Sequence, residues 1–180
     1  MLGKIMIKNH TKKDNQRRDL LRIKREFLSL PDSTRNPESF FRFFQLLPEY
    51  TEIKKIISFT PLPDEPDISL INDHLYKSDK EVILIPAKAS SPIPPNTQNV
   101  DTVIVPMQGF DRFGNRIGRG GGWYDRFLSM ILAENPKICK LSVCFSFLEM
   151  PQIITDDKDV KMDIIITEKE IIRPFDSLFT

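Results

Sequence analysis

The stretch of sequence that decides the fold runs from residue 106 to residue 126 and reads Pro106-Met-Gln-Gly-Phe-Asp-Arg-Phe-Gly-Asn-Arg-Ile-Gly-Arg-Gly-Gly-Gly-Trp-Tyr-Asp-Arg126. Six of the seven glycines in the chain lie within it, so backbone geometry is being specified there. A short apolar run at 103–105 precedes the stretch, and an apolar pattern with helical spacing at 123–132 follows it. The stretch therefore connects a strand to a helix.

Three consecutive glycines, Gly120, Gly121 and Gly122, remove every Cβ from the turn that enters this helix. Backbone N–H groups can then approach a ligand closely, and the helix start adds unpaired donors and partial positive charge. These features predict a cradle for phosphate groups. Arg116 and Arg119 lie close enough in the sequence to reach the same anion.

Generic motifs leave a second interpretation open, in which the glycines only form a tight turn that lets strand and helix pack. The Walker pattern is absent because no Gly-Lys-Ser/Thr follows the glycines. The Rossmann pattern fits badly because the loop comes late and no acidic strand end follows at the required distance.

Helical and extended patterns alternate on both sides of the glycine-rich stretch. Short apolar runs predict strands at 56–59, 82–85, 103–105, 141–147 and 163–167, and helical patterns fall at 67–76 and 123–132. Continuous apolar runs are typical of strands that are buried on both faces of a parallel sheet. We therefore expect an α/β fold, with residues 1–180 forming a single three-layer α/β/α domain around a mainly parallel sheet.

The amino-terminal part predicts two helices. The first opens near Asp14 and carries an apolar stripe at Leu20, Leu21, Ile23, Phe27, Leu28 and Leu30. Arg18, Arg22 and Arg25 are spaced so that they share one face of it. Asn36-Pro37 predicts the start of a second, largely buried helix, whose apolar positions are Phe40, Phe41, Phe43, Phe44, Leu46 and Leu47. Residues 87–100, rich in proline, predict a connecting loop.

Composition and charge exclude several classes of function. Hydrophobic residues make up 40% of the chain and no apolar run reaches the length of a membrane helix, so we expect a globular protein with no membrane partner. The first residues lack the apolar stretch of a secretion signal, which favours a cytoplasmic location. With two histidines and two cysteines in no metal or redox pattern, chemistry centred on histidine or zinc is poorly supported.

Net charge is distributed unevenly along the chain. Residues 1–26 hold nine Lys/Arg against three Asp/Glu, although the whole chain has a net charge of only +1. A basic start can bind nucleic acid, direct a few cations at a ligand's phosphates, or form a solvated face. No nucleic-acid motif accompanies it, so we expect no nucleic-acid partner.

The longer string Phe110-Asp111-x-x-Gly114-x-Arg116-x-Gly118-x-Gly120-x-Gly122-Trp-Tyr-Asp125 resembles the signature of the 5-formyltetrahydrofolate cyclo-ligase family. Weaker similarities follow in order: Arg18-x-x-Leu21-Arg22 to the family's opening Lys-x-x-Leu-Arg, residues 65–68 to its segment after the first strand, and 159–168 to its closing strand. The chain departs from the family at Arg18, where Lys is usual, and at Met107, where Gly is usual. Residues 87–100 are shorter than the corresponding family segment, which helps to enclose folate.

The resemblance implies an enzyme that uses ATP to cyclise 5-formyltetrahydrofolate to 5,10-methenyltetrahydrofolate, releasing ADP and phosphate, with ATP and folate as its small-molecule partners. The alternative is a nucleotide-binding relative that lacks the folate reaction. Phosphoryl transfer requires positioning and charge neutralisation more than acid–base catalysis, which suits this histidine-poor sequence.

The resemblance also implies a role for each matching residue. Arg116 is the expected catalytic residue, because it would neutralise the transferring group. The residues expected to bind ATP are Arg18, Arg22, Gly118, Arg119, Gly120, Gly121, Gly122, Trp123 and Tyr124. Glu65, Trp123 and Tyr124 are expected to bind the folate, and Asp125 and Asp159 to hold Mg²⁺.

Overall fold

The structure is a computed structural model that describes residues 2–29, 36–86 and 96–174, the stretch 2–11 by its backbone alone. The Pro-rich part of the expected loop at 87–100 and the expected core position Leu30 lie outside the described residues.

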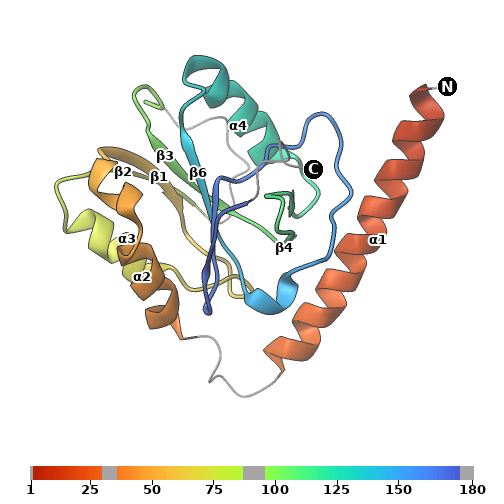
Figure 1. Cartoon of the computed structure of the whole chain (residues 1–180), viewed down its shortest axis with the longest axis horizontal. Coiled ribbons are helices and arrows are strands. Elements are labelled where there is room, and N and C mark those ends of the chain that lie inside the picture. Colours follow the sequence, from red (N-terminus) through yellow and green to blue (C-terminus); the bar gives the residue numbers. More distant parts are fainter. Residues whose placement is uncertain (1, 30–35, 87–95, 175–180) are drawn as a thin grey trace.

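Six strands form one sheet in the order β2-β1-β3-β6-β7-β8 (Figure 1). They are β1 (Lys55–Phe59), β2 (Glu81–Ile85), β3 (Thr102–Pro106), β6 (Cys139–Val143), β7 (Ile164–Ile166) and β8 (Ile171–Ile172). All neighbours pair in parallel except β7 and β8, which are antiparallel. The predicted mainly parallel sheet is confirmed. The strand expected over 141–147 ends at Val143, and the chain turns into the short 3₁₀ helix η3 (Ser146–Leu148).

Helices cover both faces of the sheet, as the predicted α/β/α layers require. Figure 1 shows α2 (Pro37–Gln45) and α3 (Ser69–Tyr76) on one face and α4 (Trp123–Glu134) on the other. A 3₁₀ helix, η2 (Pro48–Glu52), leads from α2 to β1. None of the described helices is long and apolar enough to cross a membrane.

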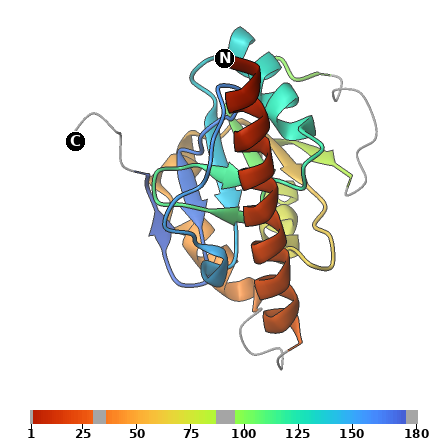
Figure 2. The same ribbon diagram turned by 90° about the vertical axis from the view of Figure 1, so that its right-hand side faces the viewer.

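Helix α1 (Leu2–Leu28) runs along the side of the molecule, in front of the sheet in Figure 2. It begins at Leu2, so the expected start near Asp14 is wrong: the segment before Asp14 belongs to the same helix. Its register is set by Leu20, which is 1% exposed. A Cβ added to Gly109 would lie 2.6 Å from Leu20 Cδ1, so only glycine at 109 allows the helix to come this close.

The second predicted helix is confirmed, with Asn36 Oδ1 accepting a hydrogen bond from the Glu38 N–H at 2.9 Å as its amino-terminal cap. Phe40 and Phe44 are fully buried in the core. Leu46, which was expected to be buried, is 64% exposed and follows the last residue of the helix as its C-cap.

A small antiparallel pair, β4 (Gly109–Phe110) and β5 (Arg116–Ile117), lies between β3 and α4 in the chain. Its turn is organised by Asp111, which is fully buried. Asp111 accepts hydrogen bonds from the backbone N–H groups of Phe113, Asn115 and Ile153 at 2.8–3.0 Å. This half of the glycine-rich signature therefore builds the hairpin that carries Arg116.

Candidate active site

A cavity of about 840 Å³ lies where the carboxyl ends of β1 and β3 meet the glycine-rich loop. Phe59 ends β1, and Pro106 and Met107 follow β3, so the strand ends supply one wall. Ligands of open α/β sheets bind outside the carboxyl ends of the strands, and the volume is in the range of small-molecule sites. The expected site residues that line this cavity are Glu65, Arg116, Gly118, Arg119, Gly120, Gly121, Gly122, Trp123, Tyr124, Asp125 and Asp159.

The glycine loop forms the cavity edge next to the start of α4. Gly120 has φ +94° and Gly122, the residue before α4, has φ +61°, a conformation that other residues adopt only with strain. Gly122 is the cap residue of the helix and makes no side-chain hydrogen bond to its first turn. A Cβ added to Gly121 would meet nothing within 4 Å, which leaves the approach to this backbone open. The loop has the geometry expected of an anion cradle.

Arg116 projects from β5 into the same cavity. Its side chain is only 4% exposed, and Nη2 donates to Asp125 Oδ1 at 2.5 Å. Burial lowers the pKa of Arg116 below the usual arginine value, while the carboxylates of Asp125 and Asp159 oppose this shift. The Nε–H of Arg116 is buried and finds no acceptor among the described residues. A buried guanidinium with an unused donor is well suited to an incoming anion.

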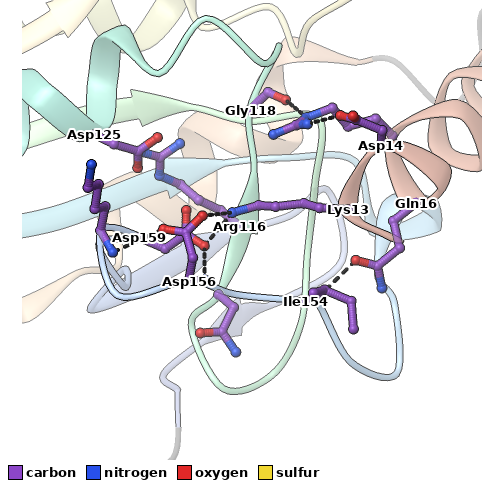
Figure 3. A network of polar contacts seen from close by, with 12 residues as sticks. Lys13, Asp14, Gln16, Arg116, Gly118, Asp125, Ile154, Asp156 and Asp159 are labelled. Atoms are coloured by element: carbon purple, nitrogen blue, oxygen red, sulfur yellow. Dashed lines mark hydrogen bonds and ion pairs between the residues drawn. The ribbon is translucent and has the colours of Figure 1, made fainter. Parts of the chain in front are cut away.

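One face of α1 adds two further cations. Lys13 and Arg17 line the cavity, and Arg17 Nε donates to the carbonyl of Gly118 at 3.2 Å. Lys13 forms ion pairs with Asp159 and, at 3.7 Å, with Asp156 (Figure 3). The helix is thereby joined to both the glycine loop and the acidic loop before β7.

Gln16 completes the attachment of α1 to the site. Its amide donates to the carbonyl of Gln152 at 2.8 Å. It also accepts from the Ile154 N–H at 2.9 Å (Figure 3). This two-way contact holds the helix over the 152–154 segment, and so keeps Lys13 directed at the cavity.

Arg18 and Arg22, expected to bind ATP, are exposed and do not line the cavity. They do share a helix face with Arg25, as predicted, but that face points away from the sheet because Leu20, not Leu21, is the buried leucine. Sequence reasoning missed Lys13 and Arg17. Their spacing of four residues is that of the lysine and arginine in the family's opening pattern, with Gln16 in place of leucine, and this was the available signal.

Glu65 is nearly buried and already engaged. Its Oε1 accepts from Arg119 Nε and Nη2 at 3.1 and 3.0 Å, and its Oε2 accepts from the Leu62 N–H at 2.9 Å. Arg119 also bonds to Asp64 at 2.5 Å, so it ties the glycine loop to the segment after β1. Burial, together with the charge of Glu65, raises the pKa of the Tyr124 phenol, which therefore remains a neutral donor.

Packing takes part of the aromatic surface that was expected to bind a ring. Trp123 stacks on Phe127 with ring centroids 5.0 Å apart and an interplanar angle of 24°. Tyr124 meets the Trp123 ring edge to face at 4.8 Å. A pterin or adenine ring would therefore contact those parts of the Trp123 and Tyr124 rings that do not pack against Phe127 or against each other.

Asp125 and Asp159 both line the cavity, on either side of Arg116 (Figure 3). In the described part of the chain, no group of three or more His, Cys, Asp or Glu side chains is arranged to hold a metal by itself. Mg²⁺ needs only one or two carboxylates when phosphate oxygens and water complete its shell. The donor set therefore fits a magnesium ion that arrives with a nucleotide.

Comparison with known proteins agrees with the motif. The model of the 5-formyltetrahydrofolate cyclo-ligase family matches residues 85–168. A cyclo-ligase of Mycoplasma pneumoniae is 33% identical over 92 residues, which cover 51% of this chain and 52% of the relative. The mouse cyclo-ligase is 25% identical over 155 residues, 67% of this chain and 76% of the relative. The matched part thus spans about half the length of the first relative and three quarters of the second.

Solved structures show the same fold. The 5,10-methenyltetrahydrofolate synthetase of Aquifex aeolicus superimposes with a TM-score of 0.71 at 24% identity, over 93% of this chain and 95% of its own. The Mycoplasma pneumoniae synthetase gives a TM-score of 0.65 at 19% identity, over 87% and 98% of the two chains. These matches agree with the resemblance seen in the sequence, and the solved structures confirm the α/β fold.

Proposed function

We propose, from its relationship to the 5-formyltetrahydrofolate cyclo-ligase family, that this chain catalyses the ATP-dependent cyclisation of 5-formyltetrahydrofolate to 5,10-methenyltetrahydrofolate, with release of ADP and phosphate. The observation that carries the proposal is the pairing of a glycine cradle with the buried Arg116 in one cavity. Among the side chains that the structure describes, no histidine lines that cavity, which suits a reaction driven by phosphoryl transfer rather than by acid–base catalysis.

The reaction needs the formyl oxygen to become a leaving group. In the proposed mechanism this oxygen attacks the γ-phosphorus of ATP, the bond to the ADP oxygen breaks, and a phosphate ester forms. N10 of the folate then attacks the formyl carbon, phosphate leaves with the ester oxygen, and N10 loses its proton. The enzyme's task is to hold formyl oxygen and phosphorus in line and to neutralise the developing charge.

The cations around the cavity are assigned to the phosphates. Arg116, which already lacks one hydrogen-bond acceptor, would face the transferring group, while Lys13 and Arg17 would hold the outer phosphates from α1. The N–H groups of the glycine loop would contribute neutral donors beside them. A magnesium ion held by Asp125 and Asp159 would supply additional positive charge to the phosphate oxygens.

Glu65 and Tyr124 are assigned to the folate. Glu65 is a carboxylate acceptor for the N–H groups of a pterin, and Arg119 must share or release it when the pterin binds. Because Arg119 is anchored on the glycine loop, nucleotide phosphates compete with Glu65 and Asp64 for its guanidinium. Nucleotide binding would therefore draw Arg119 away from Glu65 and leave the Glu65 carboxylate free to accept hydrogen bonds from folate.

The proposal is tested by following methenyltetrahydrofolate absorbance with and without ATP and Mg²⁺. Product that requires both supports it. ATP binding without product at any folate concentration would instead identify the nucleotide-binding relative that lacks the reaction. A single functional domain over residues 1–180, a cytoplasmic location and the absence of a nucleic-acid partner stay predictions, testable by limited proteolysis, fractionation and salt-dependent oligonucleotide binding.

A further inference from the structure

A buried polar cluster lies behind the cavity wall, between α1 and the segment that follows β3. Lys24 is 3% exposed, and its ammonium donates to Asp64 Oδ2 at 2.9 Å and to Gln108 Oε1 at 3.0 Å. Gln108 is 4% exposed and also lines the cavity. The proposed mechanism uses neither Lys24 nor Gln108.

Lys24 fixes the orientation of the Gln108 amide. An ammonium group only donates hydrogen bonds, so the amide oxygen must face Lys24 and the NH₂ group must face the other way. That Nε2 is buried and finds no acceptor among the described residues. A buried donor without a partner is costly, and such groups in native proteins call for an explanation.

The neighbourhood of Gln108 shows what acceptor would fit. Asp64 joins the cluster to Arg119, which in turn binds Glu65 on the same cavity. The wall therefore combines an acceptor, the Glu65 carboxylate, with a donor, the Gln108 amide. This combination is complementary to a lactam edge, in which a ring N–H stands next to a carbonyl oxygen, and the pterin of folate carries such an edge at N3–H and C4=O.

We propose that Gln108 is a specificity-determining residue that donates from Nε2 to the C4 carbonyl oxygen of the pterin, beside Glu65. The proposal rests on the proposed function, because it takes folate as the ligand. Met107, which is buried on the same wall, is an unbranched side chain that can move aside to let the carbonyl reach the amide.

The test measures direct binding of two ligands, 5-formyltetrahydrofolate and its 4-amino-4-deoxy analogue, by titration calorimetry without ATP. The analogue presents an NH₂ group where the folate presents an acceptor, so it cannot accept from Gln108. In Gln108→Leu we expect the Kd for 5-formyltetrahydrofolate to rise roughly tenfold while the Kd for the analogue changes little, since a site built to pair a polar group discriminates against its absence. Met107→Leu is the matched control, because it repacks the same wall and removes no donor.

The outcomes separate the two proposals. An unchanged preference for the 4-oxo ligand in Gln108→Leu, or an equal loss for both ligands, would overturn the role of Gln108 and leave the proposed function standing. A wild-type chain that binds no 5-formyltetrahydrofolate would overturn both. If Gln108→Leu does not fold, Gln108→Met replaces it. The proposal is also refuted if the wild-type chain binds 5-formyltetrahydrofolate no more tightly than it binds the 4-amino analogue.

Discussion

The assignment of the inner face of α1 to the nucleotide can be tested with two adjacent arginines. Arg17 lines the cavity and donates to the Gly118 carbonyl at 3.2 Å, whereas Arg18 is exposed and donates to the Asn15 side chain on its own helix. Arg17→Met removes a cation from the cavity and keeps the length of the aliphatic stem. Arg18→Met makes the same chemical change one residue later, on the outer face.

The size of the expected effect follows from these contacts. A hydrogen bond to a charged group contributes about 1.5–3 kcal/mol, which corresponds to a roughly 10- to 150-fold rise in Kd for ATP in Arg17→Met. Loss of the Gly118 contact and of the ion pair with Asp14 costs about 1 kcal/mol of stability, or roughly 2–4 °C in Tm for a chain of this size. Arg18→Met is expected to change the free energy of unfolding by less than about 0.5 kcal/mol and to leave ATP binding as it is.

The assay is calorimetric titration of ATP in the presence of Mg²⁺ at low and moderate salt, with melting curves of both variants as the folding control. Equal losses of ATP affinity in Arg17→Met and Arg18→Met would show that general positive charge on α1 matters rather than its inner face. Weaker binding in Arg18→Met alone would restore the assignment made from the sequence pattern.

The remaining predictions concern the loop, the metal and the thiols. Gly121→Val is expected to fold with an unchanged Tm, since its Cβ meets no protein atom, and to weaken ATP binding; unchanged ATP affinity would argue against the cradle. Gly122→Ala, at φ +61°, is expected to lower stability by about 1 kcal/mol in a denaturant titration. Asp159→Asn is expected to raise the Mg²⁺ concentration needed for half-maximal activity, and an unchanged Mg²⁺ dependence would remove Asp159 from the metal site. Burial raises the pKa of Cys139 to about 11 and of Cys144 to about 12, so both thiols of the folded chain should resist alkylation at pH 8, and rapid labelling of the native protein would contradict this expectation. The free energy of unfolding should fall as the pH rises above about 9, because the thiols of the unfolded chain ionise first.

The sheet and the glycine loop could be predicted because their signals are local. Runs such as 103–105 and 164–166 are apolar at every position, which is typical of strands covered on both faces. Among the glycines, Gly114, Gly120 and Gly122 have a positive φ, and Gly109 has no room for a Cβ. The strand boundaries were less certain, as the early end of β6 at Val143 shows, because an apolar sequence continues into η3.

The orientation of α1 could not be predicted, because its sequence offers two basic faces. Both Leu20 and Leu21 are apolar, and each would bring a different set of cations towards the sheet. The choice is made by a contact distant in sequence, the seating of Leu20 against Gly109. Long-range contacts of this kind leave no periodic signal in a single sequence, so the orientation that brings Lys13 and Arg17 to the cavity was found only in the structure.

The roles of Asp111 and Gln108 were hidden for a related reason. Asp111 was seen as part of the signature, but its function is to hold a turn through backbone N–H groups that include that of Ile153, 42 residues later. The Gln108 amide acquires its meaning from Lys24, 84 residues earlier. Each is a polar residue whose partner is brought near by folding alone.

The central claim, that this cavity couples ATP cleavage to ring closure of 5-formyltetrahydrofolate, is tested most directly by measuring both products in one reaction. Methenyltetrahydrofolate is followed by its absorbance and inorganic phosphate by a coupled assay, with wild type and Arg116→Met compared at saturating ATP and Mg²⁺. We predict that the wild type forms the two products in equal amounts and none of either without ATP, and that Arg116→Met loses both in parallel. Phosphate release by the wild type without methenyltetrahydrofolate, at any folate concentration, would contradict the claim.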